Sequence, residues 1–161
     1  ERVESSNLER VVTLVSKTNQ FNLTTRRHSR TQVQAMLESP GTIALALRLR
    51  DKFGDQGIVA VLLALCDNDQ STLKVDSFLV SCRALGRGVE DALWATTLER
   101  ARQQKVRRLE AEYIATAKNA IVAELYDRLG LQRIRQDNGS IYYCLEPITV
   151  PILPSWIRLG Q

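Results

Sequence analysis

Residues 80–89 read Val-Ser-Cys-Arg-Ala-Leu-Gly-Arg-Gly-Val and join an apolar run to an amphipathic one. Gly86 and Gly88 allow the main chain to turn tightly and to approach a ligand without a Cβ in the way. A helix that follows at once supplies unpaired N–H donors, and Arg83 and Arg87 add full positive charges. The stretch predicts a strand-to-helix junction that cradles an anion, although the glycines also suit a plain turn with solvated arginines.

The segment before this junction predicts three antiparallel strands. Residues 43–49 alternate Ile and Leu with smaller or charged neighbours, as in a half-buried strand. Residues 51–57, "DKFGDQG", form a hairpin connection, and residues 58–65, "IVAVLLAL", are apolar throughout, as expected for a central strand. Residues 73–81 complete the meander.

The segment after the junction alternates helices and strands. Residues 89–105 predict a helix, residues 107–114 a strand, residues 119–130 a second helix and residues 140–146 a final strand. The expected apolar face of the second helix consists of Ile121, Val122, Leu125 and Leu129, and Gly130 is its expected C-cap.

Two helices precede the meander, and an extended tail ends the chain. The first helix covers residues 7–17, and the second begins after Ser29 or Thr31 and runs through Leu37. The Pro-containing residues 147–161 predict an extended wrap. The element order predicts an α+β, or mixed α/β, fold with a mostly antiparallel central sheet flanked by helices.

Length and composition indicate one domain spanning residues 1–161. No apolar stretch is long enough for a membrane span, and no signal peptide is evident, so we expect a cytoplasmic protein. Glu at position 1 suggests a domain cut from a longer polypeptide. The net charge of +4 is compatible with phosphorylated small molecules or acidic carrier proteins as partners. We expect no nucleic-acid partner, because the sequence has no aromatic platform or motif for nucleic-acid binding.

The three cysteines are odd in number and widely spaced, which argues against disulfides and a C-x-x-C metal site. With one histidine in the chain, we expect no metal. Asn119, at a predicted helix start, is suited to bind an amide of a ligand chain, and Tyr126, two turns later, to protonate a leaving thiolate. As alternatives, Asn119 is a helix cap and Tyr126 a half-buried aromatic.

These two blocks resemble the motifs of the GNAT acyltransferases. Arg83, Gly86 and Gly88 match the R/Q-x-x-G-x-G/A element of that superfamily, and residues 119–131 are similar to its Asn…Tyr…Gly-Phe element, with Leu131 where the aromatic commonly falls. The resemblance implies a GNAT-like fold with CoA pyrophosphate on the first block, pantetheine on Asn119 and Tyr126 as general acid. The residues that it assigns to the cofactor are Val80, Arg83, Leu85, Gly86, Arg87, Gly88, Val89 and Asn119.

A narrower resemblance extends from about Leu8 to Glu146. "LVSKTNQFNLTTRRHS" together with "VSCRALGRGVEDAL" resembles the GNAT-like C-terminal domain of FkbH-type proteins, in which a HAD-like phosphatase region precedes this domain. The resemblance implies a glyceryl transferase in polyketide-type biosynthesis. It would load a glyceryl unit from 1,3-bisphosphoglycerate onto the phosphopantetheine thiol of an acyl carrier protein, with the phosphatase region in cis or in trans.

Cys82 is the candidate acyl carrier in such a transfer. It stands at a strand end beside Arg83 and close to a helix start, a setting that favours the thiolate; the alternative is a small residue packed under the loop. His28 is the only histidine and a candidate base, and two preceding arginines favour its neutral form. The candidate substrate ligands are Asn19, Gln20, Asn22 and Thr24, which could instead build turns with their own backbone.

Two other functions stay open. The first is an acetyl-CoA-dependent N-acetyltransferase, in which CoA fills the cleft and no cysteine intermediate forms. The second is a catalytically inert module that docks a carrier protein beside a separate phosphatase. The basic run at residues 100–108 would be a docking patch in that case, or otherwise the solvated face of a helix.

Overall fold

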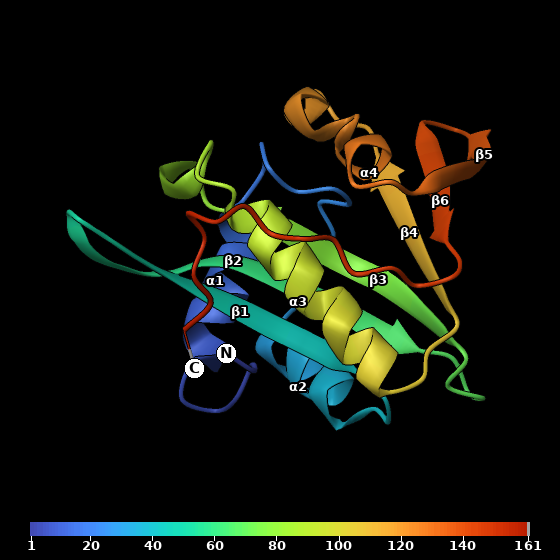
Figure 1. The fold of residues 1–161 in the computed structure, drawn as a ribbon, viewed down its shortest axis with the longest axis horizontal. Coiled ribbons are helices and arrows are strands. Elements are labelled where there is room, and N and C mark those ends of the chain that lie inside the picture. The colour runs from blue at the N-terminus through green and yellow to red at the C-terminus, as the bar shows by residue number, and fades with distance from the viewer. Residues whose placement is uncertain (161) are drawn as a thin grey trace.

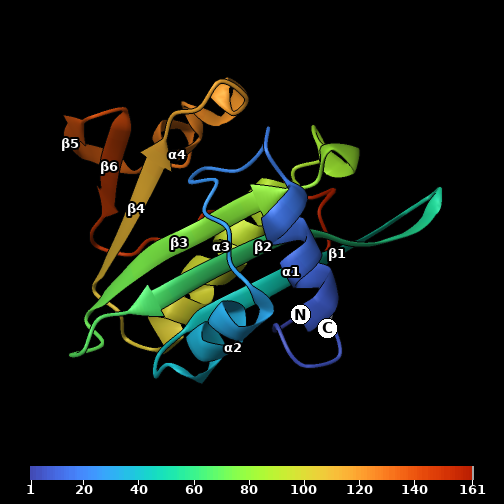
Figure 2. The ribbon, with the colours of Figure 1, turned by 180° about the vertical axis from the view of Figure 1, so that it is seen from behind.

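A computed structural model describes residues 1–160 of the chain. They form a six-stranded sheet in the order β1-β2-β3-β4-β6-β5, in which only the β3–β4 pair is parallel. Helix α3 covers one face of the sheet (Figure 1), and α1 and α2 cover the other (Figure 2). The predicted α+β class with a mostly antiparallel sheet is confirmed.

The elements follow the predicted order with two departures. The strands are β1 (Ile43–Asp51), β2 (Gly54–Cys66), β3 (Thr72–Val80), β4 (Arg108–Ile114), β5 (Gln132–Asp137) and β6 (Ser140–Leu145). The helices are α1 (Leu8–Lys17), α2 (Arg30–Glu38), α3 (Val89–Gln103) and α4 (Leu125–Arg128), with 3₁₀ turns η1 (Cys82–Ala84) and η2 (Ala120–Val122). Helix α2 starts at a capping box between Ser29 and Gln32, so the first of the two predicted starts, after Ser29, is confirmed.

The sheet separates two apolar cores. Strand β2 is buried without interruption from Ile58 to Ala64, because helices cover both of its faces. Val61 and Leu63 pack toward α1 and α2, whereas Leu62 packs toward α3. The continuous apolar run in the sequence therefore reflects a strand that lies between two helical layers.

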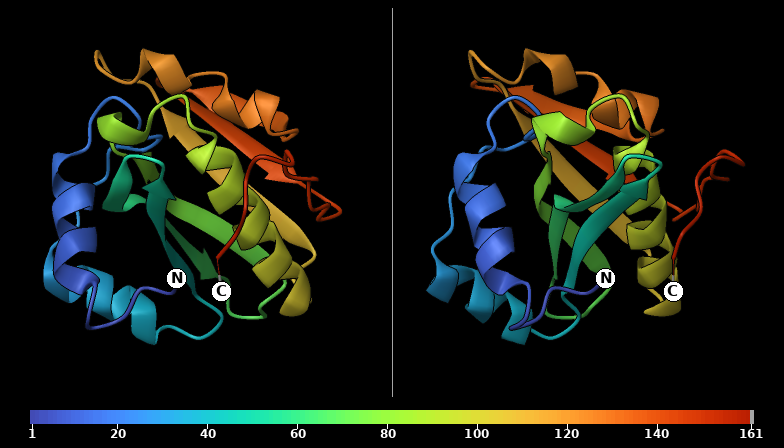
Figure 3. Two further views of the ribbon diagram at one scale, coloured as in Figure 1. Left: turned by 60° about the vertical axis from the view of Figure 1, so that its left-hand side comes forward. Right: turned by 90° about the vertical axis from the view of Figure 1, so that its left-hand side faces the viewer.

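Strands β3 and β4 pair only near their starts and then diverge. The pairing joins Thr72–Lys74 to Arg108–Glu110 and goes no further, so the sheet splits toward the carboxyl ends of both strands, as Figure 3 shows. A bulge in β3 accompanies the split, since Ser77 pairs with Leu63 and Val75 with Ala64 while Asp76 has no partner in β2.

The segment between α1 and α2 enters this split. The amide of Leu23 donates to the carbonyl of Phe78 (3.1 Å), and the amide of Val80 donates to the carbonyl of Phe21 (2.9 Å). On the other side, the amide of Ile114 donates to the carbonyl of Leu23 (2.8 Å). Residues 21–23 thus bridge β3 and β4 where the two strands no longer contact each other.

The helix predicted over residues 119–130 is interrupted. Residues 120–122 form η2, and only Leu125–Arg128 form an α-helical turn. A 3₁₀ turn advances about 120° per residue rather than 100°, so the predicted apolar stripe does not stay on one face. Ile121 is 64% exposed, and its predicted place in the core is wrong.

Strand β5 is absent from the sequence-based prediction. All six of its residues are exposed and most are polar, so the strand has no apolar alternation to reveal it. The available signal was Asn138-Gly139, which connects β5 to β6 with positive φ at both residues (44° and 83°). Such a pair is the usual two-residue hairpin turn.

Residues 147–160 form no helix or strand and run over the outer side of α3 (Figure 1). This course agrees with the predicted extended wrap, of which residue 161 lies outside the described residues. Ile148 packs against the core, whereas Ile152 is 98% exposed.

Candidate functional site

The junction between β3 and α3 has the predicted geometry. Gly86 and Gly88 both adopt left-handed conformations, with φ of 72° and 64°. Within residues 1–160, the main-chain amides of residues 86–91 donate no hydrogen bond. The amides of residues 89–91 belong to the first turn of a 15-residue helix, whose dipole gives this end a partial positive charge. The amides of residues 86–91 form what we call the amide cradle.

Cys82 lies at the end of β3, where it opens the η1 turn, and it is exposed. The alternative of a small residue packed under the loop is therefore wrong. Val80 and Val89 are buried in the core and Leu85 packs against it, so these three predicted cofactor residues shape the junction through apolar packing.

The two arginines of the junction differ in their surroundings. Arg87 forms an ion pair with Asp51 at the end of β1, which the sequence did not predict. Arg83 is exposed. Burial and the positive charge of Arg83 both lower the pKa of Arg10 in α1. Arg10 in turn donates to the carbonyl of Ile58 (3.1 Å).

Gly88 is needed for close packing as well as for its φ. A Cβ at Gly88 would lie 2.6 Å from Cη2 of Trp156 and 3.1 Å from Cδ1 of Ile157, which is too close for a side chain. A Cβ at Gly86 would meet no atom within 4 Å. The C-terminal segment therefore covers the Gly88 side of the amide cradle and leaves the Gly86 side open.

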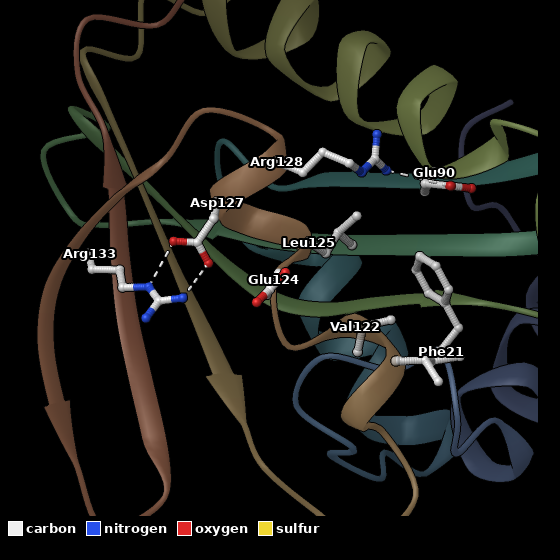
Figure 4. A pocket seen from close by; sticks show the side chains of 9 residues that line it. Phe21, Glu90, Val122, Glu124, Leu125, Asp127, Arg128 and Arg133 are labelled. Atoms are coloured by element: carbon white, nitrogen blue, oxygen red, sulfur yellow. Dashed lines mark hydrogen bonds and ion pairs between the residues drawn. The ribbon is translucent and has the colours of Figure 1, made fainter.

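A pocket of about 680 Å³ lies between the first turn of α3, η2 and α4. Figure 4 shows Phe21 and Val122 close together on its apolar side. Its other lining residues are Glu90, Ile121, Glu124, Leu125, Asp127, Arg128 and Arg133.

Ion pairs order the wall of this pocket. Arg128 pairs with Asp91 (2.6 Å) and with Glu90 (3.5 Å), which ties α4 to the first turn of α3. Arg133 donates two hydrogen bonds to Asp127, both 2.7 Å long, and holds the pKa of that carboxyl below its usual value. One carboxylate oxygen of Glu90 is buried without a partner within the described chain.

Asn119 is fully buried, and all of its polar atoms are used. Its side-chain nitrogen donates to the carbonyls of Asn22 and Ile114, each at 2.9 Å. Its side-chain oxygen accepts from the amide of Thr116 (2.8 Å) and the hydroxyl of Tyr113 (3.3 Å). The predicted pantetheine contact is therefore wrong for this conformation, since Asn119 has no free donor or acceptor and instead ties the Asn22 segment to the end of β4.

Tyr126 is equally buried, but its hydroxyl has no partner among the described residues. Its ring contacts Phe78, Trp94 and Tyr143, with ring centroids 5.3 to 6.4 Å apart. Burial raises the pKa of Tyr126 above its usual value, and the nearby positive charge of Arg26 partly opposes that shift. The Nε1 atom of Trp94 is buried and unpartnered as well, so two donors in one aromatic cluster lack acceptors.

A cluster of charged groups lies across β3 and β4. Nε2 of His28 is 2.6 Å from Oδ2 of Asp76, which also accepts from the hydroxyl of Ser77 (2.7 Å). Arg26 pairs with Glu112 at 2.5 Å and approaches Asp76 at 3.7 Å. Neither Asp76 nor Glu112 was predicted; a carboxylate in the middle of each half-buried strand was the available signal.

The four amide and hydroxyl candidates divide into two kinds. Asn22 and Thr24 are buried and bind backbone: Asn22 donates to the carbonyl of Thr18, and Thr24 to the carbonyl of Asp76. The alternative of turns with their own backbone is thus correct for Asn22, whereas Thr24 joins its segment to β3. Asn19 and Gln20 are exposed, and Asn19 accepts from Arg27.

The structure does not bring Cys82 and His28 together. Asp76, which holds His28, precedes Val80 by four residues of β3, or about 13 Å along an extended strand, and Cys82 lies still further on. His28 is therefore too far away to activate the Cys82 thiol directly.

Within residues 1–160, no three His, Cys, Asp or Glu side chains gather in a way that could hold a metal ion. No helix in this part of the chain is long and apolar enough to cross a membrane.

The fold is that of known GNAT acetyltransferases. The ribosomal-protein-S18-alanine N-acetyltransferase of Escherichia coli superposes with a TM-score of 0.69 at 15% identity, over 99% of this chain and 97% of that chain. The GNAT domain of S. lividans PAT gives a TM-score of 0.70 at 18% identity, over 91% and 88% of the two chains. Salmonella typhimurium yncA with acetyl-CoA gives 0.65 at 13% identity, over 98% and 97%.

No protein-family model matches the sequence, and no curated protein matches it. The structural matches therefore establish the GNAT fold, and the chemistry must be argued from the residues of this chain.

Proposed function

We propose that this protein is an acyltransferase that binds a phosphopantetheine thiol or thioester, with the phosphate in the amide cradle. The observation that carries the proposal is the run of amides at residues 86–91 that have no acceptor, at the start of a long helix. Such a helix start binds phosphate through its N–H groups and its dipole. The open position at Gly86 allows a phosphate to approach the main chain.

Some of the groups near the split between β3 and β4 are suited to bind the pantetheine part of such a ligand. The buried Tyr126 hydroxyl and Trp94 Nε1 have no acceptor within the described chain, and the neighbouring pocket has room for a narrow ligand. The outer edge of β3 is less accessible, because residues 21–23 already bond to Phe78 and Val80. We infer that the arm lies in the pocket between α3 and α4.

Proton transfer is assigned to groups close to the split. The Tyr126 hydroxyl is the proton donor to a departing thiolate, since burial keeps it protonated. Glu112 and the His28–Asp76 pair are the candidate proton acceptors for the attacking group.

The favoured acyl group is glyceryl, as the FkbH-type resemblance implies. Cys82 thiolate attacks the carboxyl carbon of a glyceryl acyl phosphate, and phosphate leaves with the electron pair of the broken C–O bond. The thiolate of the carrier arm then attacks the resulting thioester, and the Cys82 thiolate leaves. The exposed position of Cys82 supports its access to an acyl phosphate.

The alternative is N-acetyl transfer from acetyl-CoA to an amine. It is favoured by the acid–base cluster around Glu112, which lies away from Cys82 and needs no cysteine. Direct attack of an amine on a thioester would require only an acceptor for the amine proton and a donor to the thiolate.

An NMR titration tests phosphate binding at the amide cradle. We expect 4′-phosphopantetheine to shift the amide resonances of Gly86 and Arg87, because these N–H groups on the open side of the amide cradle gain an acceptor. Pantetheine, which lacks the phosphate, is the matched control and should leave these resonances in place. Equal shifts with both ligands, or none with either, would remove the basis of the proposal.

Intact-mass analysis separates the acyl groups. Incubation with 1,3-bisphosphoglycerate and a HAD-like phosphatase region should give a glyceryl adduct in the wild type and none in Cys82→Ser. Acetylation of an amine by acetyl-CoA, without adduct and unchanged in Cys82→Ser, would establish the N-acetyltransferase alternative. Binding of a carrier protein with no turnover in either assay would establish the docking module.

A further inference from the structure

The phosphate of a carrier-protein arm is a diester, and its second ester oxygen belongs to a serine of the carrier. A phosphate that binds in the amide cradle therefore brings the surface of the carrier against the residues around the cradle. Trp156 and Ile157 pack against Gly88, whereas a Cβ at Gly86 would meet no atom within 4 Å. The open side of the cradle is thus the side where the loop continues from η1.

The hairpin between β1 and β2 is held beside this loop. Arg87 forms an ion pair with Asp51, the last residue of β1. Lys52 and Phe53 follow Asp51 and form the hairpin tip, which projects from the molecule at the same end as η1 (Figure 1). A protein that sits over the open side of the cradle would therefore contact the hairpin tip as well. We call Lys52, Phe53, Arg83 and Arg87 the hairpin–η1 surface.

The hairpin–η1 surface and its surroundings carry more cations than carboxylates. Arg83 and Lys52 are exposed, and neither belongs to an ion pair within residues 1–160. The Lys52 ammonium lies 4.9 Å from the centroid of the Phe53 ring. The carboxylates of the hairpin, Asp51 and Asp55, are both paired with arginines. The unpaired charge on this side is therefore positive, which is complementary to an acidic partner.

The other basic run, residues 100–108, is less suited to a carrier held by its phosphate. Arg102 pairs with Glu99 (2.9 Å) and Arg108 with Glu110 (2.9 Å), so part of its positive charge is already neutralised. The run begins in the last turn of α3, whereas the cradle lies at the first turn. These 15 residues span about 22 Å, so contacts there lie far from the serine that bears the arm.

We propose that the hairpin–η1 surface docks an acidic carrier protein whose phosphopantetheine phosphate binds in the amide cradle. The inference rests on the proposed function, since it presumes a phosphate in the cradle. Attraction between these cations and carboxylates beside the arm-bearing serine orients the carrier as it approaches. Phe53, which is 74% exposed, supplies an aromatic contact of the kind that is enriched in protein interfaces.

Two synthetic peptides test this charge complementarity. Each carries 4′-phosphopantetheine on a serine, which is flanked by Asp and Glu in the acidic conjugate and by Asn and Gln in the neutral one. We expect the wild type to bind the acidic conjugate about tenfold more tightly in a calorimetric titration at low ionic strength. Because both conjugates contain the same phosphodiester, the ratio of their affinities measures the effect of the peptide charges alone.

Charge reversal locates the surface that the acidic conjugate contacts. Lys52→Glu and Arg83→Glu should each reduce the affinity ratio about threefold or more, because each places a negative charge on the hairpin–η1 surface. Arg100→Glu is the matched control, since Arg100 is exposed, belongs to the other basic run and forms no ion pair within residues 1–160. It should leave the ratio unchanged. All three side chains are exposed, so the substitutions remove no buried contact.

The outcomes separate this inference from the proposed function. Equal binding of the two conjugates by the wild type, or an unchanged ratio in both Lys52→Glu and Arg83→Glu, would overturn the docking surface and leave the proposed function intact. A ratio reduced only in Arg100→Glu would also overturn it, because docking would then take place at residues 100–108. Failure of both conjugates and of free 4′-phosphopantetheine to bind the wild type would overturn both proposals.

Discussion

Asn119 and Tyr126 belong to one short stretch of sequence, and both are almost completely buried, yet their polar atoms have opposite surroundings. Asn119 makes four hydrogen bonds that join the Asn22 segment to the end of β4. Tyr126 makes none within the described chain, and its hydroxyl ends in an aromatic cluster near the split. Burial alone does not distinguish the two residues, but hydrogen bonding does.

This difference distinguishes a structural role for Asn119 from a ligand-binding role for Tyr126. A satisfied buried amide rigidifies the structure around it, whereas a buried group without a partner costs about 1 to 3 kcal/mol and needs a reason to persist. We infer that Asn119 maintains the shape of the split and that Tyr126 retains its hydroxyl for a ligand. Each of the following predictions tests one side of this comparison.

Asn119→Ala should have the largest effect on stability. The substitution leaves the buried carbonyl of Asn22 and the partly buried carbonyl of Ile114 and amide of Thr116 without their partner. We expect a loss of about 3 to 5 kcal/mol in the free energy of unfolding, measured by urea denaturation. Gln20→Ala, at an exposed position, is the control and should stay within about 0.5 kcal/mol of the wild type. A loss below 1 kcal/mol in Asn119→Ala would contradict a framework role.

Tyr126→Phe should affect turnover rather than stability. Loss of a proton donor to a leaving thiolate lowers kcat by about a hundredfold or more. Removal of an unpartnered buried hydroxyl should leave the free energy of unfolding unchanged or raise it by about 1 kcal/mol. Tyr142→Phe is the control, because Tyr142 is only half-buried and lies on β6. A destabilised Tyr126→Phe with normal kcat would assign Tyr126 to the framework as well.

The alkaline limb of the stability curve tests the burial of Tyr126 separately. Because burial raises its pKa, Tyr126 stays protonated in the folded state while the unfolded chain ionises it near pH 10. Stability from this group is complete below pH 10 and falls above it by about 1.4 kcal/mol per pH unit. Tyr126→Phe should show a correspondingly shallower decline between pH 10 and 11, measured by denaturant unfolding. Equal slopes in both proteins would indicate a solvated hydroxyl.

Local sequence signals predicted most of the fold. The apolar run of β2, the helix start after Ser29 and the two glycines before α3 depend on a few neighbouring residues, so they can be recognised without tertiary information. Strand β5 escaped because an edge strand without a buried face has no apolar period, and the Asn138-Gly139 turn was its only local sign.

The sequence predicts the parts of the candidate site that are built from neighbouring residues, and it does not predict the contacts between residues far apart in the chain. The amide cradle follows from adjacent residues of one loop. The contact between Trp156 and Gly88, the four bonds of Asn119 and the pairing of His28 with Asp76 join residues far apart in the chain. The motif resemblance predicted a ligand contact for Asn119, because a motif match compares residue types along the sequence. It gives no information on the hydrogen-bond partners of Asn119 in the fold.

Ile121 provides the smallest and most local test of the comparison. Its side chain is 64% exposed at the rim of the pocket, whereas Leu125, one α-helical turn later in the predicted helix, is buried. Ile121→Ser should therefore change the free energy of unfolding by less than about 0.5 kcal/mol, while Leu125→Ala should cost about 2 to 4 kcal/mol. Loss of apolar surface at the rim should instead weaken 4′-phosphopantetheine binding about threefold to tenfold in a calorimetric titration. A loss of 2 kcal/mol or more in Ile121→Ser would mean that residues 119–130 form the continuous amphipathic helix that the sequence predicts. Asn119 would then begin a helix that points Tyr126 in a different direction.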